Sequence, residues 1–191
     1  MTRHAIFDRP LDAAVPHGFD QAIFGMGRYW GAERLFWRQH GVWLTEAGFA
    51  GGTAEHPTPA QVAAGATGHA EVVRVVFDSA LISYDHLLKL FWENHDPTQG
   101  DRQGEDIGSR YRSLIVAMND SQRAAATASR TDYDNRLAVA GFGPVTTRIV
   151  GPAPFWPAPE ADQQYLHRHP DAHCEPKGTG VEASMPNPDP I

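Results

Sequence analysis

The chain has 191 residues, 41% of them hydrophobic and 20% charged, and its formal net charge is −7. This length suits one domain with a full core, and the acidic balance argues against a nucleic-acid binder, which needs clustered Lys and Arg. Residues 1–20 lack the apolar segment of a secretory signal, and no apolar run approaches the roughly 20 residues that cross a bilayer. We therefore expect a cytoplasmic protein without a membrane anchor.

The first regular elements are two strands with a helix between them. The pattern predicts a short buried strand over 21–24 that runs into Gly25 and Gly27, and then a helix over 31–38. A second strand is expected over 42–49, followed by a long loop over 53–68. A strand, a glycine turn and a helix in this order direct the helix N-terminus at a pocket.

The best strand pattern in the chain covers residues 69–77, where Glu71, Val73 and Val75 share one face. Ser83 offers an N-cap to a helix that ends before residues 94–97. A polar loop over 96–109, a strand over 112–118, a helix over 120–136 and a strand over 146–150 complete the regular part.

Helices and strands mix without the strict alternation of a doubly wound fold, which predicts an α+β sandwich. We expect an N-terminal leader over residues 1–19 and a single domain over 20–174. Residues 175–191, which are rich in Gly, Pro and charged side chains, are expected to form a mobile tail.

Five segments carry a resemblance to a known family. They are Phe-Gly-Met-Gly-Arg-Tyr-Trp-Gly-Ala-Glu at 24–33, Gly-Phe-Ala-Gly-Gly at 48–52, Thr-Gly-His-Ala-Glu-Val-Val at 67–73, Phe-Trp-Glu-Asn-His-Asp-Pro-Thr-Gln at 91–99 leading to Asp106 and 111–113, and Gln-Gln-Tyr-Leu-His at 163–167. In this order and spacing they resemble the peptide methionine sulfoxide reductase A family. The resemblance implies a two-layer sandwich with a mixed sheet and a cysteine whose thiolate attacks the sulfoxide sulfur. Recycling cysteines and thioredoxin then clear the sulfenic acid.

The position of the family's nucleophile holds an arginine in this chain. Where the family has glycine, cysteine, phenylalanine, tryptophan and glycine, this chain has Gly27, Arg28, Tyr29, Trp30 and Gly31. A guanidinium keeps its proton and has no lone pair to offer an electrophilic sulfur. It cannot become a sulfenic acid, so residue 28 is predicted not to attack a sulfoxide.

Three further positions depart from the family pattern. Tyr29 replaces a phenylalanine, Pro59 falls where a pocket tyrosine would donate to the sulfoxide oxygen, and Glu182 stands at the second recycling position. Cys174 matches the first recycling position. A single substitution or sequence error in an active parent explains this set of departures poorly.

The rest of the family's pocket is retained. The resemblance implies that Trp30 lines a methyl pocket, that Glu71 is a protonated acid which donates to the sulfoxide oxygen, and that Asp106 and Tyr111 are pocket residues. His69 belongs to the same strand motif as Glu71. Arg28 is either a surface side chain or a contact to a ligand or carboxylate. If it reached Glu71, the attraction would hold that carboxyl ionised and remove the acid.

Cys174 is the only cysteine of the chain, so no intramolecular disulfide is possible. One interpretation makes it a substitute nucleophile, which requires the tail to reach the pocket. Another combines it with His167, His169 and His173 as a metal site, although this spacing fits no standard zinc pattern. The simplest interpretation is a lone thiol in a mobile tail, with neither a metal nor a cofactor bound.

Two hypotheses follow. The first is a non-reducing relative, whose pocket binds or transforms a small or peptidic ligand that is methionine-like or anionic. The ligand would be bound by Arg28, Tyr29, Trp30 and Tyr111, or Glu71 and Asp106 would carry out acid–base chemistry on it. The alternative is an active peptide-methionine (S)-S-oxide reductase that repairs oxidised methionine with Cys174 or an external thiol, and only this alternative implies thioredoxin as a partner.

Overall fold

The computed structural model describes residues 2–174 and 177–184. Its main sheet has six strands: β1 (Phe19–Met26), β2 (Val42–Ala50), β3 (Ala70–Asp78), β6 (Ser113–Val116), β7 (Arg148–Val150) and β8 (Trp156–Pro157). Their spatial order is β7-β6-β1-β3-β2-β8, and β6 and β7 are the parallel pair in an otherwise antiparallel sheet.

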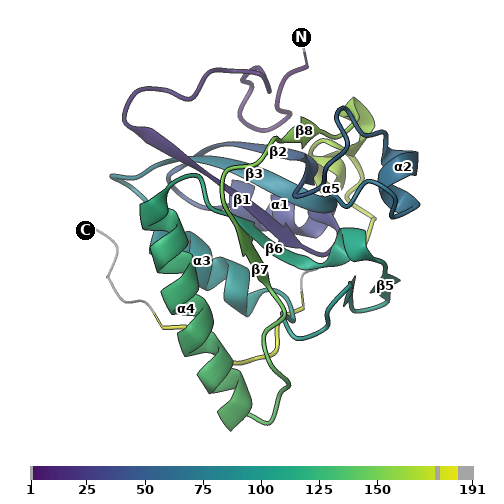
Figure 1. Cartoon of the computed structure of the whole chain (residues 1–191). Coiled ribbons are helices and arrows are strands. Elements are labelled where there is room, and N and C mark those ends of the chain that lie inside the picture. Colours follow the sequence, from purple (N-terminus) through teal and green to yellow (C-terminus); the bar gives the residue numbers. More distant parts are fainter. Residues whose placement is uncertain (1, 175–176, 185–191) are drawn as a thin grey trace.

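The alternation predicted for residues 69–77 decides what lies on each face of the sheet. Val73, Val75 and Phe77 face a core shared with α1 (Tyr29–Trp37), α3 (Tyr84–Glu93) and α4 (Asp120–Val139). Val72 and Val76 point to the opposite face, which is covered by residues from the N-terminal segment and from 150–155. In Figure 1 the N-terminal segment lies at the top of the view and α3 and α4 lie at the bottom. The predicted α+β class with a mixed sheet is confirmed.

The remaining elements are short. They are α2 (Pro59–Ala63), the hairpin of β4 (Arg102–Gln103) and β5 (Asp106–Ile107), the single turns η1 (Ser109–Tyr111) and η2 (Glu160–Asp162), and α5 (Tyr165–Arg168). The predicted helix over 31–38 begins two residues earlier, at Tyr29. Arg28 is therefore the N-cap residue of α1, and its side chain makes no capping hydrogen bond.

Both ends of the described chain are hydrogen-bonded to the domain. In the N-terminal segment, His4 is buried and its Nε2 lies 2.9 Å from the Thr45 hydroxyl. In the C-terminal segment, the Tyr133 hydroxyl donates to the Val181 carbonyl at 3.0 Å, and the Ala183 N–H donates to Glu93 at 2.9 Å. Of the segment predicted to be a mobile tail, residues 175–176 and 185–191 lie outside the described residues, and residues 179–184 contact α3 and α4.

Candidate active site

The site is built at the junction of β1 and α1. β1 ends at Met26, and Gly27 turns the chain with φ of +90°. A side chain at this position would place its Cβ 2.7 Å from Gln103, so both the dihedral and the space require glycine. The first N–H of α1, from Tyr29, donates to Glu71 Oε2 at 3.3 Å. The glycine turn thus directs the start of α1 at the carboxyl carried by β3.

Arg28 forms a two-point ion pair with Asp106 of β5. Its Nε and Nη2 donate to the two carboxylate oxygens at 3.1 and 2.5 Å. The guanidinium carbon lies 4.9 Å from the ring centre of Trp30 and 5.6 Å from that of Tyr111. The hydrogen bonds to Asp106 raise the pKa of Arg28 further above its ordinary value, so residue 28 stays a cation.

Glu71 has other partners than Arg28. Its nearest cation is Arg110, with Nε 3.6 Å from Oε1, and its side chain is only 9% exposed. Burial raises the pKa of Glu71 to about 7, although the Tyr29 N–H and the charges of Arg110 and Arg28 act in the opposite direction. Whether Arg28 pairs with Glu71 was left open by the sequence; in the structure Arg28 pairs with Asp106, and Glu71 remains able to hold a proton near neutral pH.

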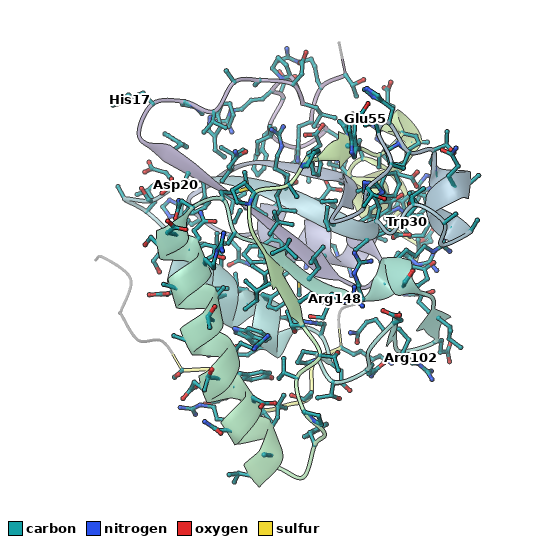
Figure 2. The ribbon with its side chains drawn as sticks, in the orientation of Figure 1. His17, Asp20, Trp30, Glu55, Arg102 and Arg148 are labelled. Carbon is teal, nitrogen blue, oxygen red and sulfur yellow. The ribbon has the colours of Figure 1, made fainter. Side chains whose placement is uncertain are left out.

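A cavity of about 690 Å³ opens beside α1. Arg28, Trp30, Asp106 and Cys174 all line it. Figure 2 labels Trp30 and Arg102 on the same side of the molecule, and Gln103, the neighbour of Arg102, is also part of the cavity wall. The cavity thus lies between the start of α1 and the β4–β5 hairpin.

Cys174 is the sole cysteine, and its thiol lies at the N-terminus of α1. The backbone N–H of Gly31 is directed at the sulfur. Burial raises the pKa of Cys174, while the Gly31 N–H and the charge of Arg28 act to lower it. The first turn of α1 therefore presents one N–H to the Glu71 carboxyl and another to the Cys174 thiol.

Aromatic stacking holds the chain that leads to Cys174. Tyr165 of α5 stacks on Trp30 with ring centres 3.8 Å apart, and His169 packs on Tyr165 at 4.3 Å. The indole N–H of Trp30 donates to Asp162 at 3.2 Å. Trp30 is thus held by its contacts with Tyr165, Arg28 and Asp162.

The other predicted site residues lie around this cavity or behind it. Tyr29 and Tyr111 are buried, and Tyr29 packs against Phe49 at 5.9 Å. His69 is not part of the cavity wall; it packs under Gly52, where a Cβ would lie 2.3 Å from its Nδ1. Pro59 begins α2, and Glu182 is exposed. Within the described residues, no group of three or more His, Cys, Asp or Glu side chains is placed to hold a metal ion.

Sequence reasoning missed a buried network behind α1. Glu33 accepts hydrogen bonds from the Gln164 backbone at 2.8 Å, the Gln164 side chain at 2.7 Å and the Thr45 hydroxyl at 3.2 Å. Burial raises the pKa of Glu33 to about 7, and these hydrogen bonds oppose the shift. Glu33 and Gln164 belong to two of the five segments that carry the resemblance, but no local sequence pattern links positions this far apart.

A two-layer fold with a thiol and an aromatic side chain at one cavity, and a buried carboxyl at the start of the adjoining helix, has counterparts among known proteins. Residues 20–186 match the family described as peptide methionine sulfoxide reductase. The peptide methionine sulfoxide reductase MsrA of Azotobacter vinelandii is 53% identical over 178 residues, which cover 93% of this chain and 82% of that protein. The MsrA of Rhodospirillum centenum is 51% identical over 183 residues, which cover 96% and 84%.

A solved structure shows the same relationship in three dimensions. Methionine sulfoxide reductase A of Corynebacterium diphtheriae superposes with a TM-score of 0.85 at 37% identity, over 97% of this chain and 90% of that one. This chain belongs to the peptide methionine sulfoxide reductase family.

These comparisons correct the first functional hypothesis. Identity of about half over nearly the whole chain to proteins named as reductases supports a reductase, so the prediction of a non-reducing relative is wrong. That prediction rested on an arginine at residue 28 and on the interpretation of Cys174 as a lone thiol in a mobile tail. The structure brings Cys174 to the same cavity. Among the residues described, no helix is long and apolar enough to cross a membrane.

Proposed function

We propose that this protein reduces methionine sulfoxide, the (S) epimer in peptides, and that Cys174 is its nucleophile in place of residue 28. The observation that carries the proposal is the position of Cys174, which lines the cavity of Arg28, Trp30 and Asp106 with the Gly31 N–H directed at its sulfur. A helix N-terminus and a nearby cation both favour a thiolate. In this proposal the chain is a divergent family member whose attacking sulfur comes from another part of the sequence.

The reaction needs one thiolate and one proton. The Cys174 thiolate attacks the sulfoxide sulfur, the sulfur–oxygen bond breaks, and the oxygen passes to Cys174 as a sulfenic acid. The substrate sulfur is reduced by two electrons and the cysteine sulfur is oxidised by two. Glu71, with a pKa of about 7, supplies the proton that the oxygen takes up.

The aromatic residues give the cavity its preference for a methyl thioether. Trp30 presents a rigid ring, held by Tyr165 and by the hydrogen bond to Asp162. The substrate's methyl group would pack on this ring, as the family resemblance implies. Asp106 is part of the cavity wall, and both Asp106 and Tyr111 contact Arg28.

Regeneration requires a reductant from outside the chain, because Cys174 has no second thiol beside it. An external thiol would condense with the sulfenic acid to a mixed disulfide and water, and a second thiol would then release Cys174. A dithiol protein such as thioredoxin supplies both sulfurs in one partner.

The test is turnover of a peptide that contains methionine-S-sulfoxide, with dithiothreitol as reductant. We expect the wild type to form the thioether peptide and Cys174→Ser to lose at least about 1,000-fold in kcat/KM. In a single turnover without reductant, Cys174 should gain one oxygen atom by mass spectrometry. An Arg28→Cys, Cys174→Ser double variant shows whether the pocket accepts its nucleophile at either position.

Two outcomes would contradict parts of this proposal. Undiminished turnover by Cys174→Ser, proportional to dithiothreitol, would mean that a thiol from solution attacks the sulfoxide. Absence of turnover by the folded wild type on either sulfoxide epimer would overturn the reductase function itself.

A further inference from the structure

We propose that Arg28 is a catalytic residue, whose free guanidinium N–H groups bind the sulfoxide oxygen while Glu71 supplies the proton. This inference rests on the proposed function. It assigns a positive role to the side chain that replaces the family's cysteine.

The first support is the fixed position of the guanidinium. Asp106 holds its Nε and Nη2 by two hydrogen bonds, and the side chains of both partners are 31% exposed. The rings of Trp30 and Tyr111 lie 4.9 and 5.6 Å from the guanidinium carbon. A two-point pair against aromatic rings restricts a side chain that is otherwise flexible.

The second support is the number of donors that remain. A guanidinium has five N–H groups and no acceptor. Asp106 takes two of them, and no other described residue accepts a hydrogen bond from Arg28. The remaining three are available in a cavity that Cys174 also lines. A substrate sulfur attacked by Cys174 would carry its oxygen beside this cation.

The third support is the chemistry of the step. A sulfoxide oxygen carries negative charge, and this charge grows as the thiolate attacks and the sulfur–oxygen bond weakens. Preorganised donors aimed at such an oxygen stabilise the transition state. Arg28 cannot give up a proton, whereas Glu71 can, because its burial outweighs the charges of Arg110 and Arg28 and raises its pKa to about 7. In this proposal Arg28 binds the oxygen and Glu71 donates the proton.

The arrangement also distinguishes substrate from product. The sulfoxide accepts a hydrogen bond from Arg28, but the thioether that remains after oxygen transfer is a very poor acceptor. Substrate is therefore held more firmly than product by this contact, which favours release of the repaired side chain.

The experiment compares two reactions of the same cysteine in the full-length protein. One is reduction of the methionine-S-sulfoxide peptide. The other is alkylation of Cys174 by iodoacetamide, which offers no sulfoxide oxygen and therefore reports only on the thiolate and its accessibility. The variants are Arg28→Gln and Arg28→Lys, with Arg38→Gln at the exposed C-terminal end of α1 as matched control.

We expect Arg28→Gln to lower kcat/KM for the sulfoxide by about 100-fold, the usual effect of removing an oxyanion donor. Its alkylation rate at high pH, where the thiol is fully ionised, should stay within about 3-fold of wild type. Arg28→Lys keeps the positive charge but lacks the planar guanidinium with its several N–H donors. Its kcat/KM for the sulfoxide should be about 10-fold higher than that of Arg28→Gln. Arg38→Gln should match wild type in both reactions.

Either of two results would overturn the role of Arg28 while leaving the reductase function intact. One is an Arg28→Gln variant that reduces the sulfoxide within about 3-fold of wild type while Cys174→Ser is inactive. The other is an equal loss in both reactions at high pH, which would make residue 28 a structural support of the thiol. Failure of the wild type itself would instead contradict the proposed function.

Discussion

The backbone N–H of Gly31 is directed at the thiol of Cys174, although the two residues lie in the first helix and in the C-terminal part of the chain. The same helix turn donates the Tyr29 N–H to Glu71. The first turn of α1 therefore directs the N–H groups of Tyr29 and Gly31, which the helix itself leaves unpaired, at a buried carboxyl and at the sole thiol of the chain.

A plot of kcat/KM against pH should rise, reach a plateau and then fall. The proposed mechanism needs the Cys174 thiolate and protonated Glu71, and burial raises the pKa of both groups, that of Glu71 to about 7. The rate should rise with pH up to about 7 as thiolate forms, then level off as Glu71 loses its proton, and fall above the thiol pKa.

Glu71→Gln tests this assignment. The variant has no carboxyl to titrate, so its rate, although lower, should continue to rise above pH 7 until the thiol is ionised. If the rate of the variant still levels off near pH 7, a group other than Glu71 causes the change of slope.

The anchor of the C-terminal segment should control how Cys174 is held. A Cβ at Gly178 would lie 1.7 Å from the Glu93 carbonyl oxygen, so Gly178→Ala must move this segment away from α3. We expect kcat/KM to fall about 10-fold, as misplaced reacting groups commonly cause, and the alkylation of Cys174 to become faster as the thiol is released. Gly143→Ala is the matched control, because no atom lies within 4 Å of its added Cβ. Unchanged kinetics in Gly178→Ala would show that the contact of this segment with α3 does not control how Cys174 is held.

The Tyr165–Trp30 stack should set the affinity for the methyl group. Tyr165→Ala removes the ring that packs on Trp30 at 3.8 Å, so the indole loses one of its two supports. We expect KM for the sulfoxide peptide to rise about 5–10-fold, which corresponds to the roughly 1 kcal/mol of an aromatic pair. Tyr165→Phe, which keeps the ring, should restore the wild-type KM. A wild-type KM in Tyr165→Ala would place the substrate elsewhere in the cavity.

The buried Glu33 should make stability depend on pH. Its pKa is raised by burial to about 7 from an ordinary value of 4.5, so the folded state binds this proton more tightly than the unfolded chain. The contribution is largest below the unfolded pKa and is lost as pH rises through about 7. We expect the free energy of unfolding, measured with urea, to fall between about pH 5 and about pH 8. Glu33→Gln should flatten this dependence, and a slope equal to that of wild type would contradict the assignment.

The sequence by itself determined much of the local structure. The alternation over residues 69–77 predicted which side chains of β3 are buried together and placed Glu71 on the face of Val73 and Val75. Gly27 marked the turn before α1, because only glycine adopts its dihedral there without strain. These features follow from periodicity and backbone sterics, which act over a few neighbouring residues.

The tertiary structure alone decided the chemistry of the site. Arg28 pairs with Asp106 and not with Glu71, and Cys174 faces the cavity of Arg28 instead of standing alone in a tail. Both facts depend on how the β4–β5 hairpin and the segment after α5 pack against the start of α1. No local pattern encodes such contacts, because packing joins residues that are far apart in the chain. For this reason, an arginine at the expected nucleophile position led to the wrong functional hypothesis.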